Sequence, residues 1–573
     1  MNFYGDIDSN NYTVNLNGGN KFTKTVDDNT YDILFLGRLY NRDEIIIGNE
    51  DISSVSDAEL ILLTYIKYGY DAFEIIDGSF SLAIYDYSRN IVILARDRLG
   101  TLPLYYTNNT NESNFIFSTR IYNIFEKYNV KAIVGKDELC EIFGLGPAHS
   151  PGKTFFKDIY EVLPGHYMTI QNSKIENKKY WDLTTFNIED SLEQSILKSK
   201  LLVKESLERQ LNTTKPVSAM LSGGLDSSVL TYLAKEHNND LNTYSIDFDG
   251  NSDNFEGNAY QPTRDSDFVK IMVDKYNLNH TELTFTTKEL YDNLKTAMLA
   301  REMPGMADVD SSMLVFLKKL KECGCDTILS GECSDEIFGG YPWYYKEHLI
   351  NSSGFPWSRS LETRKNILNE NLVSSSYLEQ YVMKALEKTS ENVIYNSGDI
   401  AENTFRRTCY NTVKWFMNTL VERTSRMASA VGIEVRIPFA DYRLFDYAYN
   451  VSYKYKLGLI DGNETPIEKY LLRKAFENEL PTDIVYRKKS PFPKTYDPKY
   501  LEMLEDEIKN IINKSSSPIL EVINIKYLYE ILNTHGENLK ENWFGQLMTY
   551  PQTIAYLIQV NMWLEAYSVE IDV

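Results

Sequence analysis

The sequence predicts two domains, an α+β domain at the N-terminal end and an α/β domain with a parallel sheet over the rest of the chain. Its 573 residues exceed the size of one hydrophobic core. Short apolar runs at residues 33–35 and 91–94 suit buried strands of the first domain. In the second domain, two apolar runs each lead into a polar loop that contains glycines. We expect the boundary near residues 185–195, because the pattern becomes helical from Ser191 onward.

The first of these loops covers residues 222–228 and reads Ser-Gly-Gly-Leu-Asp-Ser-Ser. It follows an apolar run at residues 217–221 and precedes a helix-like segment at residues 229–233. Its two glycines let the backbone turn tightly and approach an anion, and the amides that open the following helix point at the anion's oxygens. No Gly-Lys-Ser or Gly-Lys-Thr follows, so this is not the common phosphate loop. We expect the loop to bind a pyrophosphate.

The second loop, residues 330–341, carries three carboxylates within five residues: Glu332, Asp335 and Glu336. A short apolar strand, residues 326–329, leads into it. Glycines bracket the carboxylates and an apolar pair follows them, which favours a packed segment over a solvated acidic turn. Open α/β sheets bind ligands where their strands end. The sequence therefore predicts a ligand site at this loop.

Together, the two loops resemble those in the synthetase domain of asparagine synthetases, which are N-type ATP pyrophosphatases. The resemblance implies an adenine nucleotide α-hydrolase-like parallel sheet with a helical C-terminal part over residues 191–573. Its separate matches occur in one order along the chain, which favours common descent over chance. Besides the loops, the matching segments are residues 301–312, 431–439, 486–494, 543–548 and 551–556.

The resemblance implies ATP and Mg²⁺ as cofactors and a role for each loop residue. ATP would be split between its α- and β-phosphates, a substrate carboxylate would become its adenylate, and a nitrogen nucleophile would displace AMP. Asp226 and Asp335 match the family's carboxylates for Mg²⁺, which prefers oxygen ligands. Glu332 matches a glutamate that positions or deprotonates the amine, and Lys489 matches a lysine that stabilises developing charge. The pyrophosphate would be held by Ser222, Gly223, Gly224, Ser227 and Ser228.

Residues 31–106 resemble the glutaminase domain that asparagine synthetases carry. That domain is an Ntn-hydrolase-like αββα sandwich, so we expect this fold over residues 1–190. The matching segments are residues 35–41, 56–59, 77–80 and 95–100.

We expect this domain to be a degenerate, inactive glutaminase. The family's reaction needs an N-terminal cysteine as nucleophile, whereas this sequence starts with Met1 and has no cysteine before Cys140. The family's His-Arg-Gly-Pro-Asp stretch, which helps hold the glutamine carboxylate, is missing, and its Asn-Gly-Glu reads Leu-Gly-Arg at residues 36–38. The nitrogen would then come from ammonia, from an amine of the substrate or from a separate glutaminase.

Three functions remain open. The first is an ammonia-dependent, asparagine synthetase-like amide synthetase. The second is an amide-forming cyclase of natural-product biosynthesis, of the lasso peptide cyclase or β-lactam synthetase type. The third is a nucleotide-binding pseudoenzyme, which the retention of Asp226, Glu332, Asp335 and Lys489 disfavours because clustered buried charges are costly.

One departure in the synthetase domain bears on the substrate. The family's Asp-Arg-Met-Ser-Met reads Ser-Arg-Met-Ala-Ser from Ser425, so a carboxylate near the family's active site is absent. This favours a small-molecule or peptide carboxylate other than aspartate. We also expect residues 345–400 to form a surface insertion or lid that sets acceptor specificity together with residues 301–312.

Composition narrows the location and partners. Acidic residues outnumber basic ones by 81 to 59, a net charge of −22, which argues against binding to nucleic acid or anionic membranes. No apolar run could span a bilayer and no secretion signal is evident, so we expect a cytoplasmic protein. The five cysteines and six histidines show no disulfide or zinc-site spacing. A homodimer is left open.

Overall fold

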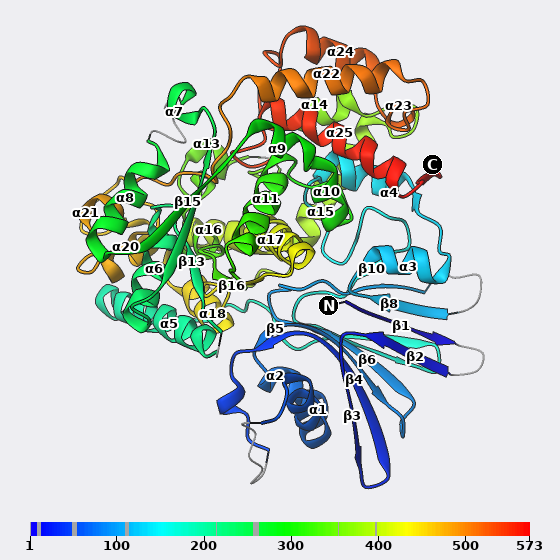
Figure 1. Ribbon diagram of the computed structural model, residues 1–573, viewed down its shortest axis with the longest axis vertical. Coiled ribbons are helices and arrows are strands. Elements are labelled where there is room, and N and C mark those ends of the chain that lie inside the picture. The colour runs from blue at the N-terminus through cyan, green and yellow to red at the C-terminus, as the bar shows by residue number, and fades with distance from the viewer. Residues whose placement is uncertain are drawn as a thin grey trace. The chain divides into compact units, whose positions relative to one another are not determined.

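The computed structural model describes residues 2–8, 13–47, 54–108, 114–213, 215–255, 263–352, 354–395 and 398–573. Met1, which enters the N-terminal cysteine argument, lies outside this set. The chain forms two compact units (Figure 1). Unit 1 comprises Met1–Glu138, His149–Asp182 and Val569–Val573, and unit 2 comprises Leu139–Ala148 and Leu183–Ser568. A single boundary at residue 190 therefore does not describe the chain, which crosses between the units more than once.

Unit 1 contains two antiparallel sheets. The five-stranded sheet has the order β10-β7-β8-β1-β2 and the six-stranded sheet the order β12-β11-β6-β5-β4-β3. The strands are β1 (Phe3–Asp8), β2 (Thr13–Gly18), β3 (Asn20–Val26), β4 (Asn29–Leu39), β5 (Gly78–Asp86), β6 (Ile91–Arg96), β7 (Tyr105–Thr107), β8 (Asn114–Ser118), β10 (Tyr160–Glu161), β11 (His166–Gln171) and β12 (Lys174–Lys179). The apolar runs at residues 33–35 and 91–94 lie in β4 and β6, as predicted.

Successive side chains of β4 point alternately into two hydrophobic cores, and this alternation shows how the layers of unit 1 are built. Leu34 packs into the core between the sheets with Phe3 and Phe117, whereas Ile33 and Phe35 face the other core. That second core packs against α1 (Asp57–Tyr68) and α2 (Ala72–Ile75), while α3 (Ile121–Tyr128) packs beside β8. The predicted αββα sandwich is confirmed.

Unit 2 is built on a five-stranded parallel sheet of order β15-β14-β13-β16-β17. The strands are β13 (Ser218–Met220), β14 (Asn242–Phe248), β15 (Asn279–Phe285), β16 (Thr327–Leu329) and β17 (Glu434–Arg436). The strand order reverses at β13, since β14 and β15 extend to one side and β16 and β17 to the other. The crevice beside the carboxyl ends of β13 and β16 is therefore where such a sheet binds ligands.

Helices cover this sheet and form the C-terminal part of unit 2 (Figure 1). They are α5 (Leu192–Leu211), α6 (Leu225–His237), α7 (Asn251–Asn254), α8 (Asp265–Tyr276), α9 (Thr287–Asp292), α10 (Leu294–Arg301), α11 (Asp308–Glu322), α12 (Ser334–Phe338), α13 (Glu347–Ile350), α14 (Leu361–Ile367), α15 (Ser375–Ser390), α16 (Ile400–Asn411), α17 (Asn418–Val431), α18 (Tyr442–Asn450), α19 (Tyr453–Leu457), α20 (Tyr470–Phe476), α21 (Thr482–Val485), α22 (Lys499–Asn513), α23 (Ile519–Val522), α24 (Ile525–Asn533) and α25 (Tyr550–Ala566).

Two features of these helices matter below. A π-helical segment, Thr412–Met417, joins α16 to α17 and alters the helical phase between them. Within the described parts of the chain, we find no helix long and apolar enough to cross a membrane.

Candidate active site

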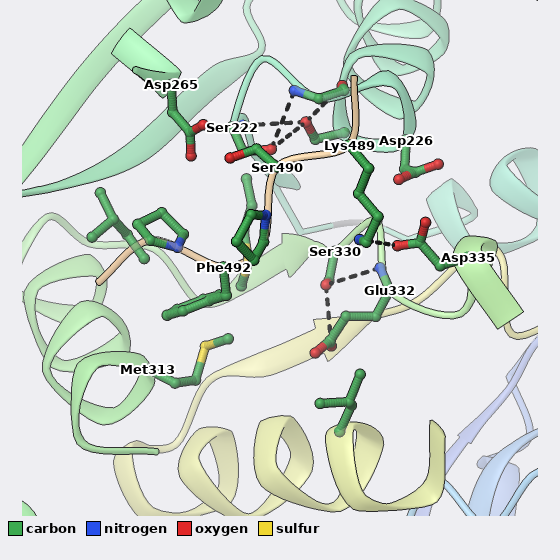
Figure 2. A pocket seen from close by; sticks show the side chains of 18 of the residues that line it. Ser222, Asp226, Asp265, Met313, Ser330, Glu332, Asp335, Lys489, Ser490 and Phe492 are labelled. Atoms are coloured by element: carbon green, nitrogen blue, oxygen red, sulfur yellow. Dashed lines mark hydrogen bonds and ion pairs between the residues drawn. The ribbon is translucent and has the colours of Figure 1, made fainter. Parts of the chain in front are cut away.

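A cavity of about 240 Å³ lies in unit 2, at the carboxyl ends of β13 and β16. The loops after these strands line it, together with a segment around Lys489 (Figure 2). The structure brings most of the predicted site residues here: Ser222, Gly224, Asp226, Ser227, Glu332, Asp335 and Lys489. Gly223 and Ser228 are not among the lining residues. Loops more than 100 residues apart in sequence therefore meet at one edge of the sheet.

The loop at residues 222–228 leads into α6, and hydrogen bonds join its first residue to the first turn of that helix. The Ser222 hydroxyl lies 3.0 Å from that of Ser227 and accepts a hydrogen bond from the Gly224 amide at 3.3 Å. Gly223 has a φ of 67°, and a Cβ there would come within 2.6 Å of Phe268, so the turn requires glycine. The Ser228 hydroxyl is buried and has no hydrogen-bond partner among the described residues. Gly223 and Ser228 thus shape the loop's surroundings without facing the cavity.

Two acids and two lysines alternate beside this loop. The Lys469 ammonium lies 2.6 Å from Asp226 Oδ2 and 2.7 Å from Asp335 Oδ1, and Lys489 lies 2.6 Å from Asp335 Oδ2. Asp226 Oδ1 also accepts a 2.6 Å hydrogen bond from Ser334. We call Asp226, Lys469, Asp335 and Lys489 the charged row. Figure 2 shows Lys489 directed at Asp335, with Asp226 close by.

Electrostatics keep this row charged despite its burial. Burial alone would raise the pKa of Asp335, but Lys469 and Lys489 outweigh it and hold that pKa well below its usual value. Burial likewise opposes the charged form of Lys469, yet Asp226 and Asp335 raise its pKa above the usual value. Asp226, Asp335 and Lys489 line the cavity, and Lys469 pairs with both carboxylates without lining it.

Lys469 is a site residue that sequence reasoning missed. It lies just before α20, is almost fully buried and has a φ of 55°, which is uncommon for a residue other than glycine. Its neighbours in sequence carry no glycine-rich or phosphate-binding pattern. Only the contacts with Asp226 and Asp335 identify it.

Glu332 is held by three donors from two segments. Its Oε1 accepts from Arg423 Nη2 at 2.5 Å and from Thr424 Oγ1 at 2.9 Å, and its Oε2 accepts from Ser330 Oγ at 3.2 Å. Arg423 also stacks over the Phe492 ring, 5.1 Å from its centre. Glu332 is thus a fixed carboxylate near Lys489.

Glu336, the third carboxylate of the second loop, turns away from the charged row. The Tyr341 hydroxyl donates to Glu336 Oε1 at 2.8 Å, and burial followed by the charge of Asp335 raises the pKa of Glu336. Lys489 lies 4.9 Å above the centre of the Tyr341 ring. This carboxylate supports the ring that borders Lys489.

Arg487 ties the segment around Lys489 to the first loop. Its Nη1 donates to the Ser222 carbonyl at 3.0 Å, its Nη2 pairs with Asp265, and its guanidinium lies 4.1 Å from the centre of the Phe268 ring. Burial raises the pKa of Asp265, and Arg487 counters that effect. These contacts hold Arg487 in place and therefore help to position Lys489, which lies two residues further on.

Two family models match the chain in succession. The asparagine synthase model matches residues 198–565, and the glutamine amidotransferase domain model matches residues 15–181. The chain belongs to the asparagine synthetase family. As a member it is an ATP-dependent ligase of the amidating type.

Individual relatives agree with this family. The glutamine-hydrolyzing asparagine synthetase 3 of Bacillus subtilis (strain 168) is 38% identical over 572 residues, which cover 98% of this chain and 91% of that protein. Asparagine synthetase 1 of the same organism is 24% identical over 563 residues, 92% of this chain and 85% of that protein. A solved glutamine phosphoribosylpyrophosphate amidotransferase from B. subtilis covers 42% of this chain and 58% of its own, with 11% identity and a TM-score of 0.22. The resemblance drawn from the two loops is confirmed.

The wall of the synthetase cavity opposite the charged row is largely apolar. Figure 2 shows Met313 and Phe492 on this side. Apolar residues that line the cavity include Met306, Met313, Phe316, Phe416, Leu420, Phe492 and Leu547. Residues 345–400, predicted as an acceptor-selecting lid, contribute none of the described lining, and residues 301–312 contribute Met306. The lining also includes Phe416 of the π-helical segment, Leu420 and Arg423 of α17, and residues 545–547 before α25.

Ser425 does not line the synthetase cavity. Its hydroxyl lies 3.2 Å from the carbonyl of Glu422 in its own helix. Leu420 and Arg423, three residues apart on α17, face the cavity, and Ser425 lies a further two residues around the helix, on another side. That the missing carboxylate changes the substrate stays a hypothesis, which the Ser425→Asp variant tests.

The donor set of the charged row fits Mg²⁺ that arrives with a nucleotide. The described residues contain no group of three or more His, Cys, Asp or Glu that could hold a metal. Asp226 and Asp335 nevertheless supply two carboxylates on either side of Lys469. Protein-bound Mg²⁺ commonly takes one or two carboxylates together with phosphate oxygens and water. The assignment of Asp226 and Asp335 as Mg²⁺ ligands stays a prediction.

Proposed function

We propose that this asparagine synthetase family member adenylates a substrate carboxylate with ATP, releases pyrophosphate and passes the acyl group to ammonia or an amine. The charged row beside the start of α6 carries the proposal. Lys489 and the amides of a helix N-terminus supply positive charge for a leaving pyrophosphate, and the buried Lys469 offsets the charge of Asp226 and Asp335.

In the first step, the chain binds ATP and orients its phosphates. Ser222, Gly224 and Ser227 present hydroxyl and amide groups where α6 begins. Asp226 and Asp335 would hold Mg²⁺, which when bound neutralises phosphate oxygens. Lys489, fixed against Asp335 and Tyr341, would stabilise the charge that develops as the carboxylate attacks.

In the second step, Glu332 would organise the proton of the attacking amine. Arg423 and Thr424 already donate hydrogen bonds to Oε1. These bonds fix the orientation of the carboxylate and leave Oε1 less able to accept a proton. Oε2 receives the Ser330 hydroxyl at 3.2 Å, a weaker contact that leaves it the better proton acceptor. The apolar wall excludes water around this carboxylate and favours transfer to nitrogen over hydrolysis.

We propose ammonia or a substrate amine, with a separate glutaminase as one supplier, as the nitrogen source. Leu36 lies in β4 where the family has the asparagine of its glutamine pocket, and its side chain packs against the apolar core between the sheets. A leucine cannot donate the hydrogen bond of an asparagine side chain. The B. subtilis relatives are named for glutamine hydrolysis, so the proposed nitrogen source would set this chain apart from them.

A cyclase that joins an amine and a carboxylate of one substrate is the second candidate. The apolar lining of the cavity, which includes Met306 and Leu547, favours a cyclase. Aspartate and ammonia offer little apolar surface that could be buried against this lining. A pseudoenzyme is disfavoured, because the charged row gathers four ionisable groups in a largely buried place, which is costly without a function.

Pyrophosphate release tests these functions. Purified chain is given ATP and Mg²⁺ with aspartate plus ammonium or aspartate plus glutamine, and products are identified by mass spectrometry. Asparagine formed with ammonium alone supports the proposal, and glutamate released from glutamine overturns the proposed nitrogen source. Turnover confined to peptides or amino acid derivatives that carry their own amine establishes the cyclase. Nucleotide binding without pyrophosphate release from any carboxylate establishes the pseudoenzyme.

A further inference from the structure

A second cavity lies in the region that sequence reasoning assigned to an acceptor lid. It has a volume of about 260 Å³ and is enclosed by α13 with the loop after it, α15 and α16. It shares no lining residue with the synthetase cavity. Its apolar part is formed by Leu349, Ile350, Pro356, Trp357 and Leu386.

Two opposite charges line this cavity. Glu387 projects from α15 and Arg407 from α16, and both residues are exposed. Neither side chain makes a hydrogen bond or an ion pair within the part of the chain that the structure describes. The cavity therefore offers one cation and one anion, both available to a ligand.

A buried amide adds a third polar group. Asn411 is 5% exposed, and its amide nitrogen donates to Ser390 Oγ at 2.9 Å. Its Oδ1 has no partner among the described residues. This oxygen has almost no accessible surface, so the Asn411 side chain shapes the cavity wall and does not contact a ligand through Oδ1.

We propose that this cavity binds a free L-α-amino acid with an apolar side chain. Arg407 would bind the carboxylate, Glu387 would bind the ammonium, and the apolar wall would pack against the side chain. The volume lies between the ~150 Å³ cavity that holds benzene and the roughly 300–1,000 Å³ clefts of drug-sized ligands, which suits an amino acid. A nucleotide would need more than one cation for its phosphates.

The occupant would act on the synthetase site through Trp357. The Trp357 ring lines the second cavity and lies 5.7 Å, centre to centre, from the Phe416 ring, which lines the synthetase cavity. The Trp357 carbonyl accepts a 2.7 Å hydrogen bond from the amide of Gly545, another lining residue of the synthetase cavity. One residue thus forms part of the wall between the two cavities.

Equilibrium dialysis of the full chain with labelled L-leucine tests the proposal. We expect saturable binding that falls at least about tenfold in Arg407→Gln and in Glu387→Gln, since each loses one charged contact. Lys384→Gln, an exposed change on α15 away from the cavity, is the matched control and should bind as the wild type does. L-Leucinamide and N-acetyl-L-leucine, which each lack one charge, should fail to bind.

Two further measurements locate the ligand. Leucine should change the intrinsic fluorescence of the wild type, and Trp357→Phe should lose most of that change. Lys489→Met, an active-site variant, should bind leucine normally. The proposal is overturned if leucine does not bind at about 10 mM, if leucinamide binds equally well, or if Lys489→Met loses binding while Arg407→Gln keeps it. Because no turnover is measured, these outcomes are independent of the proposed reaction.

Discussion

Lys469 and Asp226 are 243 residues apart in the sequence, yet the Lys469 ammonium lies 2.6 Å from Asp226 Oδ2. The same ammonium lies 2.7 Å from Asp335 on the other loop. A cation between two buried carboxylates allows both to remain ionised at close range, because it offsets their mutual repulsion. Lys469 thus joins the two loops into one anion-handling centre.

We expect Lys469→Met to lower pyrophosphate release by about 100-fold or more, since a preorganised charge in a site of this kind is worth 10²–10³ in rate. The change also leaves Asp226 and Asp335 facing each other without their shared partner. Lys474→Met on α20 is the control, because Lys474 is partly exposed and pairs with Glu477 away from the cavity. Circular dichroism and melting temperature separate loss of chemistry from loss of fold. Release within about twofold of wild type in a folded Lys469→Met protein would contradict this role.

Asp335→Asn should abolish pyrophosphate release while the fold is retained. The substitution removes the charge that pairs with both lysines of the row and, by our proposal, one of two Mg²⁺ ligands. Chelation of Mg²⁺ should likewise stop the wild-type reaction, and added Mg²⁺ should restore it. Asp483→Asn, an exposed change on α21, is the control and should keep wild-type rates. Unchanged turnover in Asp335→Asn would remove the metal assignment.

Glu332→Gln should separate the two chemical steps. Glutamine can still accept from Arg423 and Thr424 but cannot take a proton, so ATP–pyrophosphate exchange should persist within about tenfold while amide formation falls by about 10²–10⁴. The exchange assay reports adenylation alone, and mass spectrometry reports the amide. If exchange and amide formation fall by the same factor, Glu332 acts in adenylation and not on the amine.

The parts of the site that lie within one local segment could be predicted from the sequence. The loops 222–228 and 330–341 each follow a buried strand and carry glycines where the backbone turns, so residue type and spacing predict their position. The parallel sheet then brings them together without further sequence information. Lys489 was found from its matching neighbours in sequence.

The parts that depend on packing between distant segments could not be predicted. Lys469 and Arg423 sit in ordinary basic contexts, and only the tertiary contacts with Asp226 and Glu332 reveal them. The face of α17 that meets the cavity depends on the π-helical segment Thr412–Met417, whose wider turn shifts the phase that a 3.6-residue period would give. The position of Ser425 relative to the cavity likewise depends on how α17 packs.

Ser425→Asp should leave the choice of carboxylate substrate unchanged, because position 425 lies off the cavity-facing side of α17. Leu420→Ala, on the cavity face, should raise the Michaelis constant for the carboxylate, since it removes apolar contact area. Comparing both variants over a panel of carboxylates checks the assignment. A gain of aspartate activation in Ser425→Asp would show that this position reaches the substrate.

Asp308 gives a pH-dependent test of the packing that supports the cavity wall. Burial raises the pKa of Asp308 from 3.8 to about 6, and Gln552 donates to its Oδ2 at 3.1 Å, which acts the other way. Because the pKa of Asp308 is higher in the folded state than in the unfolded state, the folded state binds a proton at this carboxyl more tightly. The free energy of unfolding therefore falls as pH rises from about 4 through about 6. Relative to its value at low pH, the free energy of unfolding is lower by about 3 kcal/mol above pH 7 and by about 2 kcal/mol at pH 5.5.

Asp308→Asn should relieve this cost, because the amide stays neutral at every pH in the range. We expect its melting temperature to exceed that of the wild type at pH 8 and the margin to shrink at pH 5.5. Asp326→Asn is the control, since Asp326 is exposed and its ion pair with Lys321 lowers its pKa, so its loss should give no such gain. A margin that stays constant between pH 5.5 and pH 8 would mean that Asp308 is ionised throughout. The charge would then be accommodated by Lys494, the cation whose field acts on Asp308 from the loop that also carries Phe492.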